Sequence, residues 1–184
     1  MLVINFDPFP TLNTERLVLR ELEAADVNEI FFLRSDADVL KYLDKEPAQS
    51  VDEANKFIES IKENTTKNNS ILWGIALKDS NKIIGTICFW RILKEHYRAE
   101  IGYVLHPAFQ GKGMMDESMK TVLQYGFEVM QLHSVEANIN PGNIASKKVL
   151  EKNGFVREAY FKENYYYNGK FIDSAIYSLI KPAI

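Results

Sequence analysis

The sequence has almost no cysteine. Cys88 is the only one among 184 residues, so no disulfide can form within the chain. Unpaired cysteine is typical of a reducing compartment, and we therefore expect the protein to be cytoplasmic. Because Cys88 lies in an apolar run, the sequence predicts a buried, inert thiol rather than a nucleophile.

The sequence also lacks an excess of positive charge and any long apolar run. Lys and Arg number 22 against 25 Asp and Glu, and the formal net charge is −3. Nucleic acids and anionic membranes select a clustered cationic surface, so neither partner is expected. No apolar run reaches the ~18 residues of a membrane span. The segment 1–10 has no signal-peptide pattern, so we expect neither secretion nor membrane insertion.

Histidine is scarce and scattered. The three histidines are His96, His106 and His133, and none has the spacing of a metal-ligand pair. The sequence therefore predicts no metal site.

Apolar residues make up 46% of the chain, enough for the core of one globular domain over residues 1–184. Alternating apolar residues predict strands, and spacings of three and four predict helices. The predicted strands are 14–22, 71–78, 82–90, 98–105, 133–139, 155–161 and 170–180. The predicted helices are 24–36, 49–64, 113–130 and 143–154. This order, without repeat or linker, predicts an α/β domain.

Capping residues mark several predicted helix ends. Asp26 and Asn143 are expected N-caps, and Ser50 with Glu53 has the spacing of a capping box. Gly154 stands where a left-handed residue ends the last helix.

A glycine-rich turn precedes the third predicted helix. In "HPAFQGKGMM", Gly111 and Gly113 bracket Lys112 just before the helix. Free N–H groups and the positive end of the helix dipole favour a phosphate at such a point. The turn lacks the Gly-Lys-Ser/Thr of a nucleotide-triphosphate loop and the third glycine of a dinucleotide fingerprint. Taken alone, it predicts either a phosphate site or a plain turn, with Lys112 as a second cation or a solvated side chain.

The residues around this turn carry a family resemblance. The order "AEIGYVLHPAFQGKGMM", helix, strand and "NPGNIASKKVLEKNGF" resembles the GNAT superfamily of acetyl-CoA-dependent N-acetyltransferases. "TERLVLREL" and "YNGKFIDSAIYSL" resemble its RimJ/RimL-like branch, the ribosomal-protein N-acetyltransferases. The resemblance covers nearly the whole chain. It implies a central, mostly antiparallel sheet splayed by a bulge and flanked by helices, with acetyl-CoA as co-substrate and no metal.

The resemblance implies how acetyl-CoA is held. The family motif Arg/Gln-x-x-Gly-x-Gly/Ala is matched from Gln110 onward, with Met115 where Gly or Ala is usual. Main-chain N–H groups of residues 111–115 would hold the pyrophosphate. A bulge near Gly102 and Tyr103 would open the sheet to pantetheine, although Gly102 could also merely relieve packing. The implied cofactor-binding residues are Tyr103, Val104, Leu105, Gln110, Gly111, Lys112, Gly113, Met114, Met115, Asn138, Asn143 and Ser146.

Two candidate catalytic residues follow from the same resemblance. Glu100 matches the carboxylate that some relatives use as general base, here acting through water. Ser146 matches a serine implicated as proton donor to the leaving thiolate. Each has a structural alternative: a salt-bridged strand-end residue for Glu100, and hydrogen bonds to first-turn backbone for Ser146. Asn138 stands where other N-terminal acetyltransferases have glutamate, which weakens a two-carboxylate mechanism.

The expected activity is direct acetyl transfer to a primary amine, most simply the N-terminal α-amine of a ribosomal protein. An α-amine with a pKa of ~7.7 to 8.0 is partly neutral at pH 7, whereas a lysine amine at ~10.4 is not. Acetylation of a small amine (a polyamine, an amino acid or an antibiotic) and a catalytically silent acetyl-CoA-binding module are the alternatives. Tyr165, Tyr166 and Tyr167 could line an acceptor groove near the C-terminal hairpin, and strand-face packing is the alternative for at least one of them. The protein is expected to be a monomer or homodimer.

Overall fold

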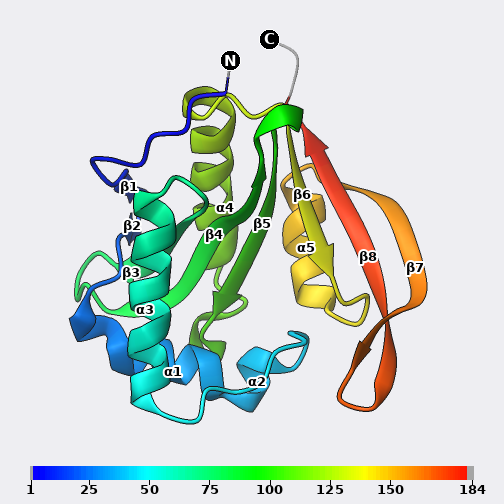
Figure 1. The fold of residues 1–184 in the computed structure, drawn as a ribbon, viewed down its shortest axis with the longest axis horizontal. Coiled ribbons are helices and arrows are strands. Elements are labelled where there is room, and N and C mark those ends of the chain that lie inside the picture. The colour runs from blue at the N-terminus through cyan, green and yellow to red at the C-terminus, as the bar shows by residue number, and fades with distance from the viewer. Residues whose placement is uncertain (1, 182–184) are drawn as a thin grey trace.

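A computed structural model describes residues 2–181 and has one eight-stranded sheet with helices on both faces (Figure 1). The strand order is β1-β2-β3-β4-β5-β6-β8-β7, and every neighbouring pair is antiparallel except β5 and β6. The strands are β1 (Leu12–Asn13), β2 (Leu17–Arg20), β3 (Ile71–Leu77), β4 (Ile83–Leu93), β5 (Arg98–Leu105), β6 (Ser134–Ile139), β7 (Val156–Tyr167) and β8 (Lys170–Ile180). The predicted mixed, mostly antiparallel α/β fold is confirmed.

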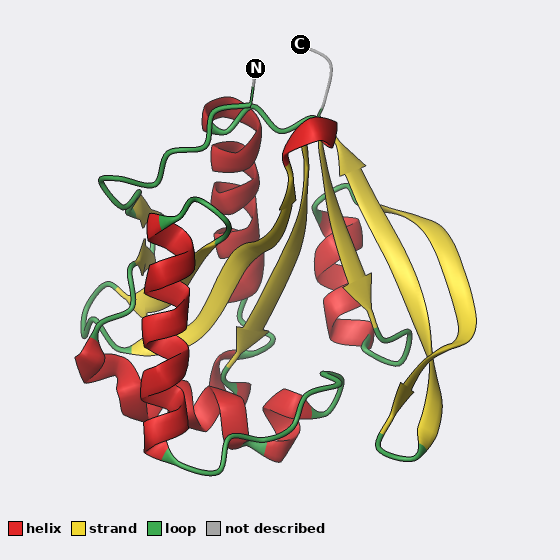
Figure 2. Ribbon diagram, in the orientation of Figure 1, coloured by secondary structure: helices red, strands yellow, loops and turns green. Residues whose placement is uncertain are grey.

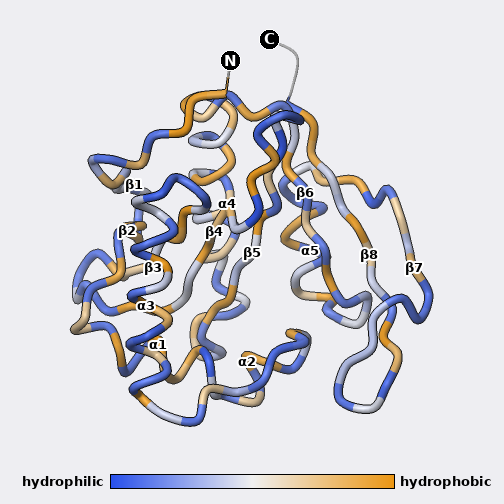
Figure 3. Tube along the Cα trace, in the orientation of Figure 1, coloured by the Kyte–Doolittle hydropathy of each residue, from blue (hydrophilic) through white to orange (hydrophobic). Residues whose placement is uncertain are grey.

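The helices divide between the two faces of the sheet (Figure 2). They are α1 (Val27–Ser35), α2 (Ala37–Leu40), α3 (Val51–Thr66), α4 (Met114–Gln124) and α5 (Ile144–Lys152), with a π-turn (Tyr125–Val129) continuing α4. Residues of α1 and α3 pack in one apolar cluster and residues of α4 and α5 in another. Hydropathy varies around α3, as expected of a helix with one buried face (Figure 3).

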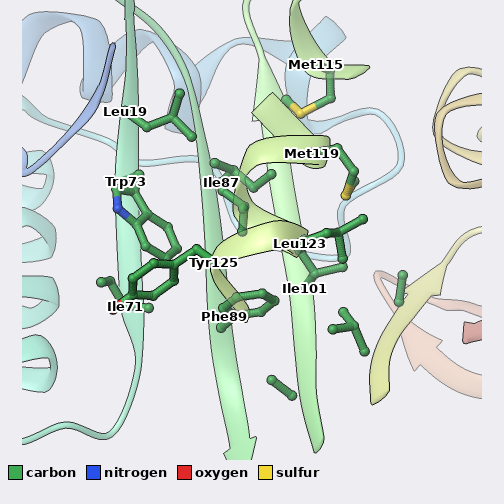
Figure 4. Packing of buried hydrophobic residues seen from close by; sticks show 14 of the residues in the cluster. Leu19, Ile71, Trp73, Ile87, Phe89, Ile101, Met115, Met119, Leu123 and Tyr125 are labelled. Carbon is green, nitrogen blue, oxygen red and sulfur yellow. The ribbon is translucent and has the colours of Figure 1, made fainter. Parts of the chain in front are cut away.

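An aromatic group fixes α4 on its face of the sheet (Figure 4). The ring of Trp73 lies edge-on to Phe89 and Tyr125, with centroids 6.2 and 5.6 Å apart. Met119 and Val122 of α4 are fully buried beside them. Edge-to-face contacts and apolar burial of this kind stabilise a unique helix position, so the N-terminus of α4 is held at the end of β5.

The sheet opens between β5 and β6. The two strands pair only from Arg98 to Glu100 of β5, although β5 continues to Leu105. Figure 1 shows them diverging beyond that point. The predicted splay is therefore confirmed.

The bulge associated with this splay lies on β4, not on β5. The register of β4 and β5 shifts between Phe89 and Arg91, so Trp90 is the extra residue, whereas Gly102 pairs regularly with Cys88. The predicted bulge near Gly102 and Tyr103 is wrong. A Cβ on Gly102 would lie 3.4 Å from the Trp90 ring, so this glycine faces the side chain that the bulge redirects.

Some predictions about helix ends and element boundaries are confirmed, and others are wrong. Asn143 caps α5, and Gly154 has a φ of +84° at the end of that helix, as predicted. Ser50 caps α3, but Glu53 bonds the N–H of Gln49 rather than that of Ser50. Asp26 makes no N-cap bond to α1; its buried carboxylate instead pairs with Arg20. The sequence analysis also missed α2 and β1 and ended β7 too early.

Candidate active site

The glycine loop joins the end of β5 to α4 through a 3-10 turn at Pro107–Phe109. Gly111 and Gly113 have φ values of +71° and +77°, which side chains rarely tolerate. A Cβ on Gly111 would meet no atom within 4 Å, so the loop leaves open space there. The amide of Gln110 donates to the carbonyl of Leu105 at 3.2 Å and ties the loop to the strand.

Free N–H groups converge at this loop. The first hydrogen bond of α4 runs from the N–H of Glu117 to the carbonyl of Gly113 at 3.0 Å. Within residues 2–181, the N–H groups of residues 111–116 have no acceptor. Together with the helix dipole, they can hold an anion such as a pyrophosphate.

A brace from the N-terminal part of the chain supports the loop. The carboxylate of Glu117 accepts hydrogen bonds from Thr14 and from the backbone and side chain of Arg16. The same guanidinium donates to the carbonyl of Lys112 at 3.0 Å. No local sequence pattern signalled this brace, because its partners lie about a hundred positions apart.

Met115 and Asp116, in the first turn of α4, face different surroundings. Met115, which stands where Gly or Ala is usual in the family motif, is buried in the core. Burial alone would raise the pKa of Asp116, but hydrogen bonds from Lys152, Lys120 and Asn153 lower it. Two lysines thus offset the negative charge of Asp116. Its carboxylate is turned towards α5 rather than towards the glycine loop.

A cavity of about 560 Å³ lies where β5 and β6 diverge. Its wall includes Glu100, Gly102, Tyr103 and Val104 of β5 and Asn138 of β6. Residues of β3, β4, α1, α2, α3, the loops after α2 and β6, and strands β7 and β8 complete the lining. Of the three tyrosines proposed for an acceptor groove, Tyr165 lines this cavity and Tyr167 a neighbouring one. Tyr166 is exposed and packs on Phe171 instead.

Glu100 lies at the fork between the strands. It is 8% exposed. Its register partner is Glu136, the last residue of β6 that pairs with β5 before the two strands diverge. Burial raises the pKa of the Glu100 carboxyl, and Arg91, whose guanidinium is 3.1 Å away, only partly offsets the effect. A carboxylate with a raised pKa that faces a cavity is suited to accept a proton.

Ser146 is bonded across the gap to Tyr103. Their hydroxyl oxygens lie 2.6 Å apart, joining β5 to α5. Burial raises the pKa of Tyr103 to about 12, although the bond to Ser146 opposes the rise. The backbone N–H of Ser146 donates to Asn143 at 3.0 Å, so Asn143 is the helix cap. The predicted alternative for the Ser146 hydroxyl, a bond to first-turn backbone, is wrong.

The other residues predicted to bind acetyl-CoA are dispersed around the gap. Val104 packs towards the α1–α3 cluster, and Leu105 and Met114 pack against the opposite one. Asn138 is exposed at the cavity wall. The ammonium of Lys112 lies 5.6 Å from the ring centre of Phe109 in an exposed loop.

Cys88 lies at the cavity wall and packs against the α1–α3 cluster, so the residue is partly rather than fully buried. Its thiol lies 3.4 Å from the carbonyl of Gly102. Burial raises the pKa of the thiol to about 11, so it is protonated at neutral pH and unsuited to act as a nucleophile.

Residues 2–181 contain neither a metal-ligand cluster nor a membrane-spanning helix. Within this range, no group of three or more His, Cys, Asp or Glu side chains could hold a metal ion. Nor does any helix there have the length and apolar character to cross a membrane.

The splayed mixed sheet and the glycine loop before α4 are the features that the family resemblance implied. Residues 16–156 match the acetyltransferase (GNAT) domain, and the chain belongs to this family. It is an N-acetyltransferase with acetyl-CoA as its co-substrate.

Curated relatives span different acceptors. The chain is 34% identical over 174 residues to the uncharacterized N-acetyltransferase YoaA of Bacillus subtilis, covering 95% of this chain and 98% of the relative. It is 28% identical to the spermidine N(1)-acetyltransferase of Vibrio cholerae, covering 86% and 89%. It is also 28% identical to the [ribosomal protein uS5]-alanine N-acetyltransferase of Escherichia coli, over 62% and 59% of the two chains.

Solved structures share the fold. A GNAT-family acetyltransferase from Bacillus anthracis superposes with a TM-score of 0.82 at 29% identity, covering 93% of this chain and 98% of that one. The spermidine N-acetyltransferase of Vibrio cholerae, in complex with CoA and spermine, gives 0.79 at 25% identity, covering 90% and 95%.

Proposed function

We propose that the protein acetylates the N-terminal α-amine of a protein, most simply a ribosomal protein, in the cytoplasm. The observation that carries the proposal is the position of Glu100, a desolvated carboxylate at the fork of the sheet and at the wall of an open cavity. Acetyl-CoA supplies the activated acetyl group. The other chemical tasks fall to residues of this chain.

The glycine loop holds the coenzyme's anionic end. N–H groups of residues 111–115 bind the pyrophosphate, and the open space over Gly111 allows a close approach. Beyond Glu100, the edge of β5 that faces β6 has no strand partner among residues 2–181. The N–H of His106 bonds Ile84 of β4, so by alternation the main-chain groups of Val104 also face β4. Those of Tyr103 and the N–H of Leu105 face the gap, where they bind the pantetheine amides. Asn138 borders the same gap on β6.

Glu100 receives the proton that the amine loses, through water. Its raised pKa brings the carboxyl closer to that of an α-amine, so the transfer is less unfavourable than to an ordinary glutamate. Arg91 keeps the carboxylate charged enough to act as a base.

Ser146 donates a proton from its Oγ to the departing thiolate and regains one from solvent. The bond of 2.6 Å orients the serine hydroxyl and links two weak acids in a chain. Tyr103 therefore acts as a positioning residue for Ser146.

An α-amine is the easiest acceptor for a site equipped in this way. At pH 7 roughly a tenth to a fifth of such amines are neutral, against less than a thousandth of lysine amines. The relative that acetylates the alanine of a ribosomal protein supports the same acceptor class.

A small polyamine is the second candidate. Three further carboxylates line the cavity, namely those of Asp44, Glu46 and Asp173, and they would attract a second ammonium group. The relative named as a spermidine N(1)-acetyltransferase supports this alternative.

Mass spectrometry after incubation with acetyl-CoA tests the choice. We expect acetylation of peptides with free N-termini and little of N-terminally blocked peptides that carry lysine. Spermidine and spermine form the second arm of the panel. Faster acetylation of the polyamines than of every peptide would overturn the proposal in favour of the alternative.

A further inference from the structure

Arg34 lines the cavity without a carboxylate partner. It lies in the last turn of α1, and its guanidinium carbon is 4.0 Å from the ring centre of Phe57 on α3. Its Nε atom is fully buried and has no hydrogen-bond partner among residues 2–181. A buried donor without a partner, on a charged group, costs folding free energy.

The comparable arginines of the protein are paired. Arg20 and Arg98 are also half-buried, and they contact Asp26 and Glu136 at 2.8 and 2.5 Å. No ion pair joins Arg34 to any carboxylate of residues 2–181. Burial lowers the pKa of Arg34, and the charge of Glu53 on α3, beyond ion-pair distance, partly opposes the effect. The guanidinium stays charged because the pKa of an arginine lies far above neutral.

The carboxylates of the cavity do not fill this role. Asp173 accepts hydrogen bonds from Tyr160 and from the N–H of Glu163. Asp44 and Glu46 belong to the loop that separates this cavity from its neighbour, since they line both. Lys45 of the same loop is a second cation at the cavity wall without an ion pair in the described part of the chain.

We infer that the cavity contains a carboxylate subsite at Arg34, so that the acceptor carries its amine towards Glu100 and an acidic group towards Arg34. The inference rests on the proposed function and narrows its acceptor. A guanidinium on an aromatic ring presents its outer edge to a carboxylate in bidentate geometry. The acidic group is either a side chain close to a peptide's N-terminus or the free carboxylate of an amino acid. A polyamine does not meet this requirement.

Matched acceptors test the subsite and separate the two sources. The peptide arm compares Ala-Glu-Ala-amide and Ala-Ala-Glu-amide with their glutamine counterparts, and the small-molecule arm compares free amino acids with their amides. In at least one arm we expect kcat/KM to be about 10- to 100-fold higher for the acid than for its neutral partner, the usual effect of a charged hydrogen bond.

Variants then assign the preference to Arg34. Arg34→Gln should bring the acid-to-amide ratio close to one, mainly through the KM of the acid, and Arg34→Lys should retain part of the preference. Arg157→Gln is the matched control, since Arg157 also lies over an aromatic ring, that of Tyr160, without a carboxylate partner in residues 2–181, but is exposed outside the cavity. It should leave the ratio unchanged. If Arg34→Gln does not fold, Arg34→Lys decides: an acid-to-amide ratio reduced from the wild-type value supports the subsite, and an unchanged ratio overturns it.

The outcomes distinguish the two proposals. Equal kcat/KM for acid and amide in both arms would overturn the subsite while the proposed acetylation of α-amines stands. A wild-type preference that survives in Arg34→Gln would also overturn it. Turnover of no member of any pair would overturn both the subsite and the proposed acceptor class.

Discussion

Glu100 is a carboxylate in a place where its charge is costly. It is 8% exposed, with Arg91 beside it, whose side chain is 51% exposed. A residue that served stability alone would be better replaced by an uncharged one at this site. Such a cost is typical of groups retained for chemistry.

Glu100→Gln should therefore separate function from stability. We expect turnover to fall ~10²- to 10⁴-fold, most strongly below the pKa of the amine, and the defect to shrink as pH rises. Because the pKa of Glu100 is raised on folding, the stability from this group is present at low pH and is lost as pH rises through the raised pKa. At pH 8 the variant should match or exceed the wild type in free energy of unfolding. Single-turnover rates and denaturant unfolding across pH measure the two effects.

Ser146→Ala is the contrasting variant. If the hydroxyl protonates the thiolate, the defect should persist over the whole pH range, since the leaving group's need does not depend on the amine. Tyr103→Phe should cause a smaller loss of the same pH-independent kind, because it removes only the partner at 2.6 Å. Full turnover in both the Glu100 and Ser146 variants would leave proximity and main-chain polarisation as the whole mechanism.

At the scale of elements, the N-terminus of α4 is held from two sides. The core packs its buried face, and the brace of Thr14, Arg16 and Glu117 fixes the glycine loop in front of it. Positive φ at Gly113 means that a valine there would strain the backbone as well as crowd a phosphate. Substitution of a residue in the brace therefore tests the role of the glycine loop without straining its backbone.

Arg16→Met should weaken acetyl-CoA binding roughly 3- to 10-fold by freeing the carbonyl of Lys112 and loosening the loop. The change keeps most of the apolar side chain and removes the charge. Calorimetry with acetyl-CoA measures the affinity, and Arg157→Met, at an exposed site on β7, is the control. Unchanged affinity in Arg16→Met would show that the loop keeps its shape without the brace.

At the scale of the whole molecule, successive side chains of β5 point to opposite faces of the sheet. Tyr103 and Leu105 pack towards the α4–α5 face, whereas Val104 packs towards the α1–α3 face. On the proposed function, the coenzyme lies along the gap at the first face and the acceptor enters from the second. Alternation of side chains along one strand thus brings the two substrates to the same backbone.

Acetyl-CoA should stabilise the whole fold by mass action. At a concentration 100 times its Kd the gain is ~2.7 kcal/mol, which corresponds to a rise in Tm of about 5 to 10 °C for a chain of this size. S-Acetylpantetheine, which lacks the pyrophosphate, should raise the Tm much less at the same concentration. Equal shifts from the two compounds would mean that the glycine loop does not anchor the coenzyme.

The sequence by itself determined the features that depend on neighbouring residues. Apolar periodicity predicted α3 and the long strands, and Asn143 and Gly154 marked the ends of α5. The glycine loop could also be predicted, because a positive φ and a helix start are local requirements. The family resemblance, carried by contiguous motifs, indicated the splayed sheet and the candidate residues.

Only the tertiary structure decided which distant groups meet. The bulge fell at Trp90 because sheet register depends on both strands, and the Tyr103–Ser146 bond and the Arg16 brace join residues 43 and about a hundred positions apart. The raised pKa of Glu100 and the unpaired charge of Arg34 depend on burial and on partners that the fold supplies or withholds. Such properties arise from contacts across the whole chain, which local patterns do not encode.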